Sequence, residues 1–242
     1  MSYLEAVAST ESTRTRCDQP HKTASRTPTS SSNSPNKIQE KKTLLVLDLD
    51  ETLVHRTIST GSLNKQCDFS FTIGERTCYV LLRPYVRKFL ERVSELFDVA
   101  IFTASGRGYA DPTLDFLDPQ HKLIARRYYK DSAVYRVDGS YYKDLSIFGI
   151  DLAKVILVDD CPTNFCMQKD NGIPIASWYT DPQDDELSTL LPFLERLAAA
   201  DDVRPIIAER LSQLRRIYWL KDLASKQKQQ EGNTEAKLNS GD

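Results

Sequence analysis

The fold is decided by the stretch Thr43-Leu44-Leu45-Val46-Leu47-Asp48-Leu49-Asp50, in which an apolar run ends in acidic residues. Apolar runs of the same kind occur at 99–102 and 155–158. All three are continuous rather than alternating, which is typical of strands in a parallel sheet with both faces covered by helices. Between the first two runs, apolar side chains recur at helical spacing from Arg83 to Phe97. This alternation predicts an α/β fold with a doubly wound, Rossmann-like parallel sheet.

Proline and glycine residues suggest where the remaining elements begin and turn. We expect a helix to begin near Asp111-Pro112, and two strands between 128 and 142 to be joined by a turn at Asp138-Gly139. The apolar pattern before and after Pro192 predicts two helices, the second restarting at this proline. A last amphipathic helix is predicted from about Val203.

Composition divides the chain into one folded unit and two polar tails. Residues 1–40 are rich in Ser and Thr and poor in large apolar side chains, and 225–242 are polar throughout. Neither stretch can bury enough apolar surface to offset the entropy lost on ordering, so we expect both to be disordered. The predicted domain is therefore 41–224, a length that suits a single core.

The charge balance and the cysteines limit the possible partners and compartments. Lys and Arg total 32 against 34 Asp and Glu, so there is no strong field to attract nucleic acid. The five cysteines are scattered, as expected of reduced thiols in a nuclear or cytoplasmic protein. No apolar run reaches about 18 residues, which predicts no membrane anchor. Glu5, Glu11 and Asp18 argue against a mitochondrial transit peptide. We expect a monomer.

Polar residues follow each of the three apolar runs. Asp48 and Asp50 follow the first, Thr103-Ala104-Ser105 follows the second, and Asp159-Asp160 ends the third. Ligands of open α/β sheets bind beyond the carboxyl ends of the strands, so we expect these segments to converge on one crevice. Any one of them alone could be a helix cap or a turn. Their occurrence after all three strands favours a functional site.

Four aspartates gathered in one crevice require a cation. Close carboxylates repel one another by about 4 kcal/mol per pair at an effective dielectric constant of 20. Oxygen ligands without a nearby imidazole or thiolate cluster favour a hard ion, and we expect Mg²⁺. Lys143 could be a second cation of the site, or an ordinary solvated surface lysine; the residue pattern leaves both alternatives open.

The motifs of the chain resemble those of a known family. The stretch from Asp48 to His55, read Asp-Leu-Asp-Glu-Thr-Leu-Val-His, resembles the signature of the haloacid dehalogenase superfamily, in particular the small phosphatases acting on the C-terminal domain of RNA polymerase II and their relatives (the FCP1 homology or NLI-interacting-factor-like family). Further similar segments follow in the same order: Arg83-Pro84, Phe102-Thr103-Ala104-Ser105, Tyr109-Ala110-Asp111-Pro112, Tyr142-Lys143-Asp144-Leu145 and Ala176-Ser177-Trp178-Tyr179. The resemblance covers about 43–205.

The resemblance implies a serine/threonine phosphatase that works through an aspartyl-phosphate intermediate. By this similarity Asp48 is the nucleophile and Asp50 the general acid and base. Thr103 and Lys143 would hold the phosphoryl oxygens. Thr52 would orient the loop. The implied Mg²⁺ ligands are Asp48, the backbone carbonyl of Asp50, Asp159 and Asp160.

Three features bear on the substrate. The insertions leave room for small β-hairpins but not for a cap domain, which favours a phosphorylated protein over a metabolite. By resemblance Ile58, Ile73 and Tyr109 could form an apolar patch that takes a proline beside the phosphoresidue, although the two isoleucines could equally just pack a hairpin. Lys130 stands where the relatives tend to have a substrate-binding arginine, and Asp160 where they usually have asparagine.

The implied substrate is the RNA polymerase II C-terminal domain or another Ser-Pro phosphoprotein. Two alternatives remain open. One is a catalytically weak binding or import-type scaffold of the same fold, and the other is a phosphatase for small phosphate esters. The first is disfavoured because Asp48, Asp50, Thr103 and Lys143 are all present.

Overall fold

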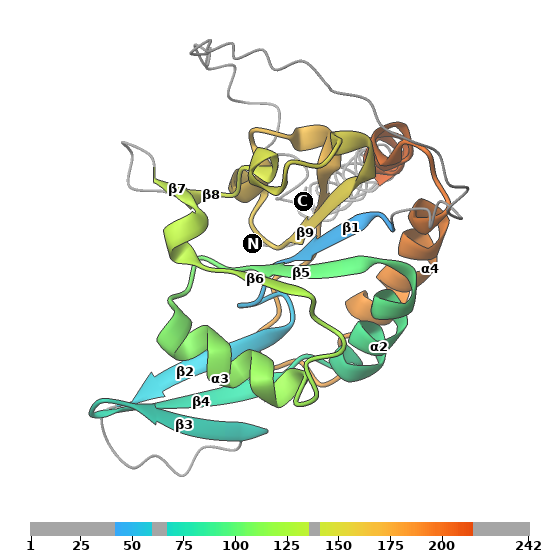
Figure 1. Ribbon diagram of the computed structural model, residues 1–242. Coiled ribbons are helices and arrows are strands. Elements are labelled where there is room, and N and C mark those ends of the chain that lie inside the picture. Colours follow the sequence, from blue (N-terminus) through green and yellow to red (C-terminus); the bar gives the residue numbers. More distant parts are fainter. Residues whose placement is uncertain (1–41, 60–66, 136–140, 215–242) are drawn as a thin grey trace, which may run out of the picture.

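The protein is built around one parallel sheet (Figure 1). The computed structural model describes residues 42–59, 67–135 and 141–214. All neighbouring strands of the central sheet run parallel in the order β10-β9-β1-β5-β6. The strands are β1 (Leu44–Leu47), β5 (Asp98–Phe102), β6 (Arg126–Tyr128), β9 (Val155–Asp159) and β10 (Gly172–Pro174). The predicted α/β class with a central parallel sheet is confirmed.

Side chains of the central strands point alternately to the two faces of the sheet. Leu45 and Leu47 belong to the larger core, and Leu44 and Val46 to the smaller one. The larger core is completed by α2 (Val86–Leu96), α3 (Arg107–Leu117) and α4 (Glu186–Ala198). On the other face the described cover consists of short 3₁₀ helices, not the α-helices expected there. The ones with side chains in the smaller core are η3 (Leu145–Phe148), η4 (Leu152–Lys154) and η5 (Pro162–Phe165). Two more 3₁₀ helices are η2 (Lys130–Ser132) and η6 (Lys169–Asn171).

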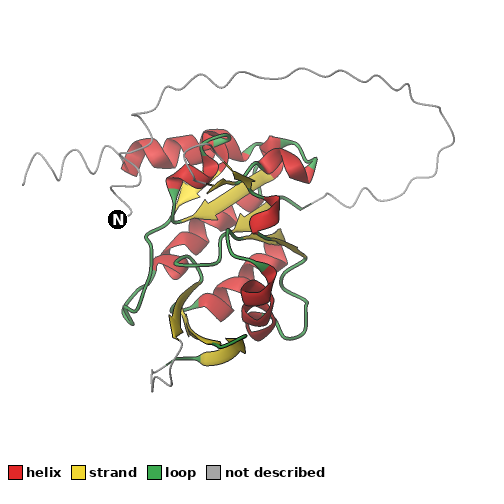
Figure 2. Cartoon of the chain, turned by 90° about the vertical axis from the view of Figure 1, so that its left-hand side faces the viewer, coloured by secondary structure: helices red, strands yellow, loops and turns green. Residues whose placement is uncertain are grey.

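A second, smaller sheet lies beside the central one (Figure 2). It is antiparallel with the order β2-β4-β3, and comprises β2 (Val54–Ser59), β3 (Phe69–Ile73) and β4 (Arg76–Leu82). Gly74, with φ of 59°, makes the tight turn between β3 and β4. The insertion is thus one strand larger than the hairpin expected between 55 and 82, because the segment after the acidic loop pairs along the whole of β4.

Two predictions based on proline were wrong. α3 begins at Arg107, four residues before the expected start, and contains Pro112. α4 is one continuous helix with Pro192 inside it, not two helices. In each case the packing of the apolar face outweighs the lost hydrogen bond of one proline. Because α3 starts early, Tyr109 belongs to the helix.

The remaining expectations are partly covered by the described residues. β7 (Val134–Tyr135) and β8 (Tyr141–Tyr142) pair antiparallel, and the turn expected between them lies outside the described residues. A final helix is described over 203–214. The two predicted tails and the predicted domain end at 224 also lie outside the described residues. Within the described ranges, no helix is both long and apolar enough to cross a bilayer.

Candidate active site

The loop after β1 is held rigidly at the carboxyl edge of the central sheet. The amide of Asp48 continues the sheet by donating to the carbonyl of Val158 at 2.9 Å. Leu49 and Leu53 are fully buried and anchor the loop, and the amide of Leu53 donates to the carbonyl of Leu49 at 2.9 Å. Glu51 adopts φ of 59° to complete the turn. The side chains of Asp48 and Asp50 are thereby placed beyond the strand end.

A buried arginine fixes the far end of this loop. Arg83 is 1% exposed and donates from Nη1 to the carbonyl of Thr52 at 3.0 Å. Its Nε and Nη2 atoms form a two-pronged ion pair with Asp184 at 2.7 and 2.8 Å. This pairing joins the loop to the segment before α4, so Arg83 supports the site without lying at its chemical centre.

Lys143 lies at the centre of a buried ion-pair network. Its Nζ atom donates to Asp48 Oδ1 at 2.5 Å and to Asp159 Oδ2 at 2.6 Å. Lys143 is only 1% exposed. The second oxygen of Asp48 accepts from the Thr52 hydroxyl at 3.1 Å. Both oxygens of Asp48 are therefore held. Of the two alternatives for Lys143, the structure excludes the solvated surface lysine.

Burial governs the protonation of this network. It raises the pKa of Asp48 to about 7, although Lys143 acts in the opposite direction, and the charge of Asp159 raises it further. Burial would by itself lower the pKa of Lys143, but Asp159 and Asp48 outweigh burial and raise it, so the ammonium stays charged. A single cation thus serves two buried carboxylates, which leaves an excess of negative charge.

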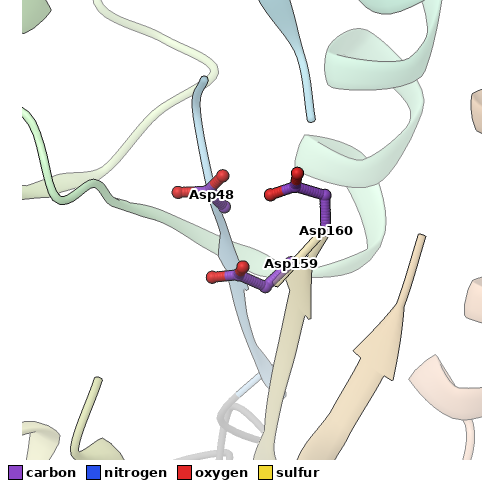
Figure 3. Close-up of side chains that lie close together, drawn as sticks. All are labelled: Asp48, Asp159 and Asp160. Atoms are coloured by element: carbon purple, nitrogen blue, oxygen red, sulfur yellow. The ribbon is translucent and has the colours of Figure 1, made fainter. Parts of the chain in front are cut away.

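The excess negative charge is greatest in a cluster of three carboxylates (Figure 3). Asp48, Asp159 and Asp160 each place an oxygen within 4.8 Å of the others. Asp159 Oδ1 accepts from the amide of Cys161 and from Asn164 Nδ2 at 2.9 and 2.8 Å. Burial, followed by the charge of Asp48, raises the pKa of Asp160 to about 6. This all-oxygen set fits a hard divalent cation, which would offset the charge.

Asp50 is held differently, by hydroxyl groups. Its Oδ2 accepts from Ser105 Oγ at 2.6 Å and has Thr103 Oγ1 at 3.4 Å. Its Oδ1 accepts from the hydroxyl of Tyr109 at 2.6 Å. The amide of Ser105 in turn donates to Thr103 Oγ1 at 2.9 Å, so the three polar residues form one connected cradle. Such a cradle fixes the direction of the Asp50 carboxylate.

The structure brings most of the predicted site residues together. Thr52, Thr103, Lys143 and the four aspartates surround the ends of β1, β5 and β9. Lys130 is next to them in the backbone, because its amide donates to the carbonyl of Ser105 at 3.1 Å. Its ammonium, however, lies 4.8 Å from the ring centroid of Tyr141 in β8 and is exposed to solvent.

The predicted apolar patch is only partly as expected. Ile58 and Ile73 are 45% and 40% exposed, and both point to the face of the small sheet that packs on α3. Tyr109 is 4% exposed, and its hydroxyl is used by Asp50. The ring of Tyr109 packs near that of Phe71, at 6.1 Å between centroids, so of these three residues only the two isoleucines are exposed. A contact between Tyr109 and a substrate proline stays a prediction.

Sequence reasoning missed several partners of the site. Ser105 belongs to the polar segment that follows the second apolar run. Its proximity to Asp50 could therefore have been predicted from the convergence of strand ends. Ser177, which holds Asp160, also belongs to one of the motif segments, whereas Asn164, which holds Asp159, carries no local pattern that points to it. Arg56, whose guanidinium lies 4.0 Å over the ring of Tyr109, gave no signal because this contact depends on tertiary packing.

The fold and site define an α/β protein with an acidic, cation-compatible centre and a buried lysine at the carboxyl edge of its parallel sheet. A family model described as NLI interacting factor-like phosphatase matches residues 43–204. The chain belongs to this family.

Several curated proteins are similar to about 70% of the chain. The chain is 47% identical over 180 residues to "CTD small phosphatase-like protein 2" of Dictyostelium discoideum, covering 73% of this chain and 31% of the relative. It is 40% identical over 172 residues to "Carboxy-terminal domain RNA polymerase II polypeptide A small phosphatase 1" of Homo sapiens, covering 69% and 64%. The "Nuclear envelope morphology protein 1" of Schizosaccharomyces pombe is 41% identical over 172 residues, covering 69% and 36%. The matched region thus spans 31% to 64% of these relatives' lengths.

Among solved structures, a match is "The Structure of Fcp1, an essential RNA polymerase II CTD phosphatase". It has a TM-score of 0.47 and 21% identity, and covers 78% of this chain and 66% of the other.

Proposed function

We propose that this protein is a Mg²⁺-dependent phosphatase of phosphoserine and phosphothreonine in proteins, acting through a phosphate bound covalently to Asp48. The observation that carries the proposal is the environment of Asp48. Its two oxygens are held by Lys143 and Thr52, and it faces Asp159 and Asp160 across the cluster. A carboxylate that is fixed, buried and paired with a permanent cation is suited to nucleophilic attack.

In the first step an oxygen of Asp48 forms a bond to phosphorus while the bond to the serine or threonine oxygen breaks. Asp50 gives its proton to the departing oxygen. In the second step water attacks phosphorus, the bond to Asp48 breaks, and Asp50 takes a proton from the water. Thr103 and Lys143 hold the phosphoryl oxygens in both steps. The Ser105 and Tyr109 hydroxyls keep Asp50 aimed at the leaving group.

The metal would be held by Asp48, the backbone carbonyl of Asp50, Asp159 and Asp160. When bound, Mg²⁺ supplies positive charge that stabilises the negative charge of the transferring phosphoryl group. Its ligand set is supported by the three carboxylates that lie within 4.8 Å of one another. Asp160 brings one charge more than asparagine would, so we expect tight binding of the cation.

The proposed substrate is the C-terminal domain of RNA polymerase II or another protein with Ser-Pro phosphorylation sites, in the nucleus. The names of the relatives support this class of substrate and compartment. The exposed Ile58 and Ile73 beside the site could contact a flanking proline. Within 54–82 the described segments form only the small sheet, which leaves the proposal for an open, uncapped site intact.

The test is hydrolysis of p-nitrophenyl phosphate and phosphoserine peptides by the purified protein. We expect turnover with Mg²⁺, loss of turnover in chelator, inhibition by beryllium fluoride, and no turnover for Asp48→Asn with the fold retained. Asp50→Asn should be nearly inactive and should accumulate a hydroxylamine-sensitive phosphoenzyme. Activity of Asp48→Asn above a tenth of wild type would overturn the nucleophile. Faster hydrolysis of sugar phosphates than of phosphopeptides would favour a small-molecule phosphatase, and no turnover at all a binding scaffold.

A further inference from the structure

We propose that Arg56 is a specificity residue of this site, whose guanidinium binds an acidic group close to the phosphoresidue. The acidic group is a carboxylate or a second phosphate on the same substrate chain. The inference rests on the proposed function, because it concerns the substrate of the same site. It is carried by the position of Arg56, by its contact with Tyr109, and by its hydrogen-bonding groups.

The position of Arg56 is between the acidic loop and the exposed end of β2. Val54 starts β2 and forms a bridge with Asp50, whereas Ile58 lies near the other end and is 45% exposed. Side chains two apart in a strand share a face, so Val54, Arg56 and Ile58 line one side of the small sheet. A substrate chain that places its phosphoresidue at Asp48 and crosses Ile58 must pass Arg56.

The contact with Tyr109 orients the guanidinium. Its central carbon lies 4.0 Å from the ring centroid, and the hydroxyl of the same ring donates to Asp50. A cation over the face of a tyrosine ring is attracted by the ring electrons, so this contact holds the guanidinium in place. Tyr109 is therefore the one side chain between Arg56 and Asp50, the proposed general acid. The Arg56 guanidinium is held in place before any substrate binds.

The described residues leave the donors of Arg56 unused. Within 42–59, 67–135 and 141–214, no carboxylate or carbonyl accepts a hydrogen bond from its side chain, although the residue is half-buried. Seven other arginines in these ranges each pair with a carboxylate: Arg83, Arg92, Arg107, Arg126, Arg127, Arg196 and Arg204. A guanidinium carries five donors in a fixed fork that matches a carboxylate or a phosphate. The geometry therefore provides a prepared anion contact.

Arg56 could instead serve only to pack on Tyr109. In that case its loss would disturb Asp50 and slow all substrates by the same factor. An anion contact predicts a loss confined to substrates that carry the acidic group. Arg107 is the matched control, because it also stacks on a tyrosine, 4.1 Å from the ring centroid of Tyr129, but already has Asp131 at 3.6 Å.

The experiment measures kcat/KM for phosphoserine peptides of one sequence, in which each flanking position in turn is alanine, glutamate or a second phosphoserine. For the wild type we expect about a tenfold preference for the acidic residue over alanine at one of these positions, weakening with salt. In Arg56→Gln this ratio should fall to about one, and Arg56→Lys should keep part of it. Arg107→Gln should retain the full ratio.

The readout is a ratio within each variant, so a uniform change in activity cancels. Glutamate and phosphoserine peptides separate the two sources of the charge. The inference is overturned if the wild type shows a kcat/KM ratio of acidic to alanine peptides near one, or if Arg56→Gln keeps the wild-type ratio. In either case, turnover of p-nitrophenyl phosphate that depends on Asp48 would leave the proposed function standing. If no turnover is found, the same ratios are measured as Kd in fluorescence polarisation with Asp48→Asn protein and its Arg56→Gln double variant, so the inference is tested either way.

Discussion

The two aspartates of the loop after β1 have opposite surroundings. Asp48 is 6% exposed and is bound by an ammonium group from a segment 95 residues away in the chain. Asp50 is held by the hydroxyls of Ser105 and Tyr109, next to a face of the small sheet that ends in the exposed Ile58. We call the surroundings of Asp48 the closed side, which is held by charge, and the surroundings of Asp50 the open side, which is held by neutral groups. In the proposed reaction the closed side carries the chemistry common to all substrates, and the open side is where substrates can be distinguished.

The largest effect should follow from removing the cation of the closed side. Lys143→Met leaves the buried Asp48 and Asp159 without their cation, so we expect the free energy of unfolding to fall by about 3 kcal/mol. Turnover should fall by a factor of about 10³, because the charge that holds the nucleophile and the phosphoryl group is gone. Urea denaturation and steady-state kinetics measure the two effects.

A surface lysine provides the control for this change. Lys154 is 38% exposed and lies 3.9 Å from Asp201. Lys154→Met should cost less than about 1 kcal/mol and leave turnover unchanged. If both lysine variants unfold at the same urea concentration, the view of the closed side as an essential charge network is wrong.

On the open side, the loss of one hydroxyl should have a smaller effect. Tyr109→Phe removes one of the two close donors to Asp50 and leaves Ser105 in place. We expect kcat to fall about tenfold with little change in KM, since a hydrogen bond to a charged group contributes about 1.5 kcal/mol or more. Steady-state kinetics with p-nitrophenyl phosphate measure the change.

Tyr129 is a matched control, because it is also buried and also donates to a carboxylate, Asp111, at 2.5 Å. Tyr129→Phe should reduce stability by a similar amount without lowering kcat. Equal losses of kcat in the two variants would show that Tyr109 supports the fold rather than the direction of Asp50.

The central strands were predictable because a strand that is buried on both faces is a continuous apolar run in the sequence. The apolar runs at 99–102 and 155–158 match β5 and β9 to within one residue at each end. The final helix was also predictable, since it begins at 203 as expected. The start of α3 and the continuity of α4 were not, because Pro112 and Pro192 carry a strong local signal that tertiary packing overrides.

The site was predictable to the extent that it depends on strand ends. The rule that polar residues gather beyond the carboxyl ends of parallel strands brought Asp48, Asp159 and Asp160 together. Lys143 follows the short strand β8 and has no periodic pattern that would place it, so its role came from the resemblance alone. The contact of Arg56 with Tyr109 joins a strand to a helix and could not be read from either segment by itself.

Burial, and then the charge of Asp48, raises the pKa of Asp160 to about 6. Because this value exceeds that of an unfolded aspartate, about 4, the native state binds more protons between these pH values. The stability that Asp160 contributes is present below about pH 4 and is lost as the pH rises through about 6. The change in the free energy of unfolding caused by Asp160→Asn in the metal-free protein should therefore be more favourable at about pH 8 than at about pH 4. The difference should be on the order of 1 kcal/mol after allowance for partial exposure.

Urea denaturation in chelator at the two pH values measures this difference between the wild type and Asp160→Asn. With Mg²⁺ present the order should reverse, because the cation loses one carboxylate ligand. A difference between the two proteins that does not change with pH would show that Asp160 is ionised without cost in the native state.

The smallest effect should come from the outer end of the open side, where Ile58 is 45% exposed. It lies in one row of the small sheet with Cys78 and Phe71, and Phe71 packs on the ring of Tyr109. A proline ring resting on this row would bury apolar surface worth on the order of 1 kcal/mol, which corresponds to several-fold in kcat/KM. We therefore expect phosphoserine peptides with an adjacent proline to be hydrolysed several-fold faster than the same peptides with alanine. Ile58→Ser should bring this ratio close to one, whereas Ile147→Ser, at a similarly exposed residue of η3, should not change it. If the wild type hydrolyses both peptides at equal rates, the row around Ile58 is ordinary packing, and discrimination on the open side must come from its polar groups.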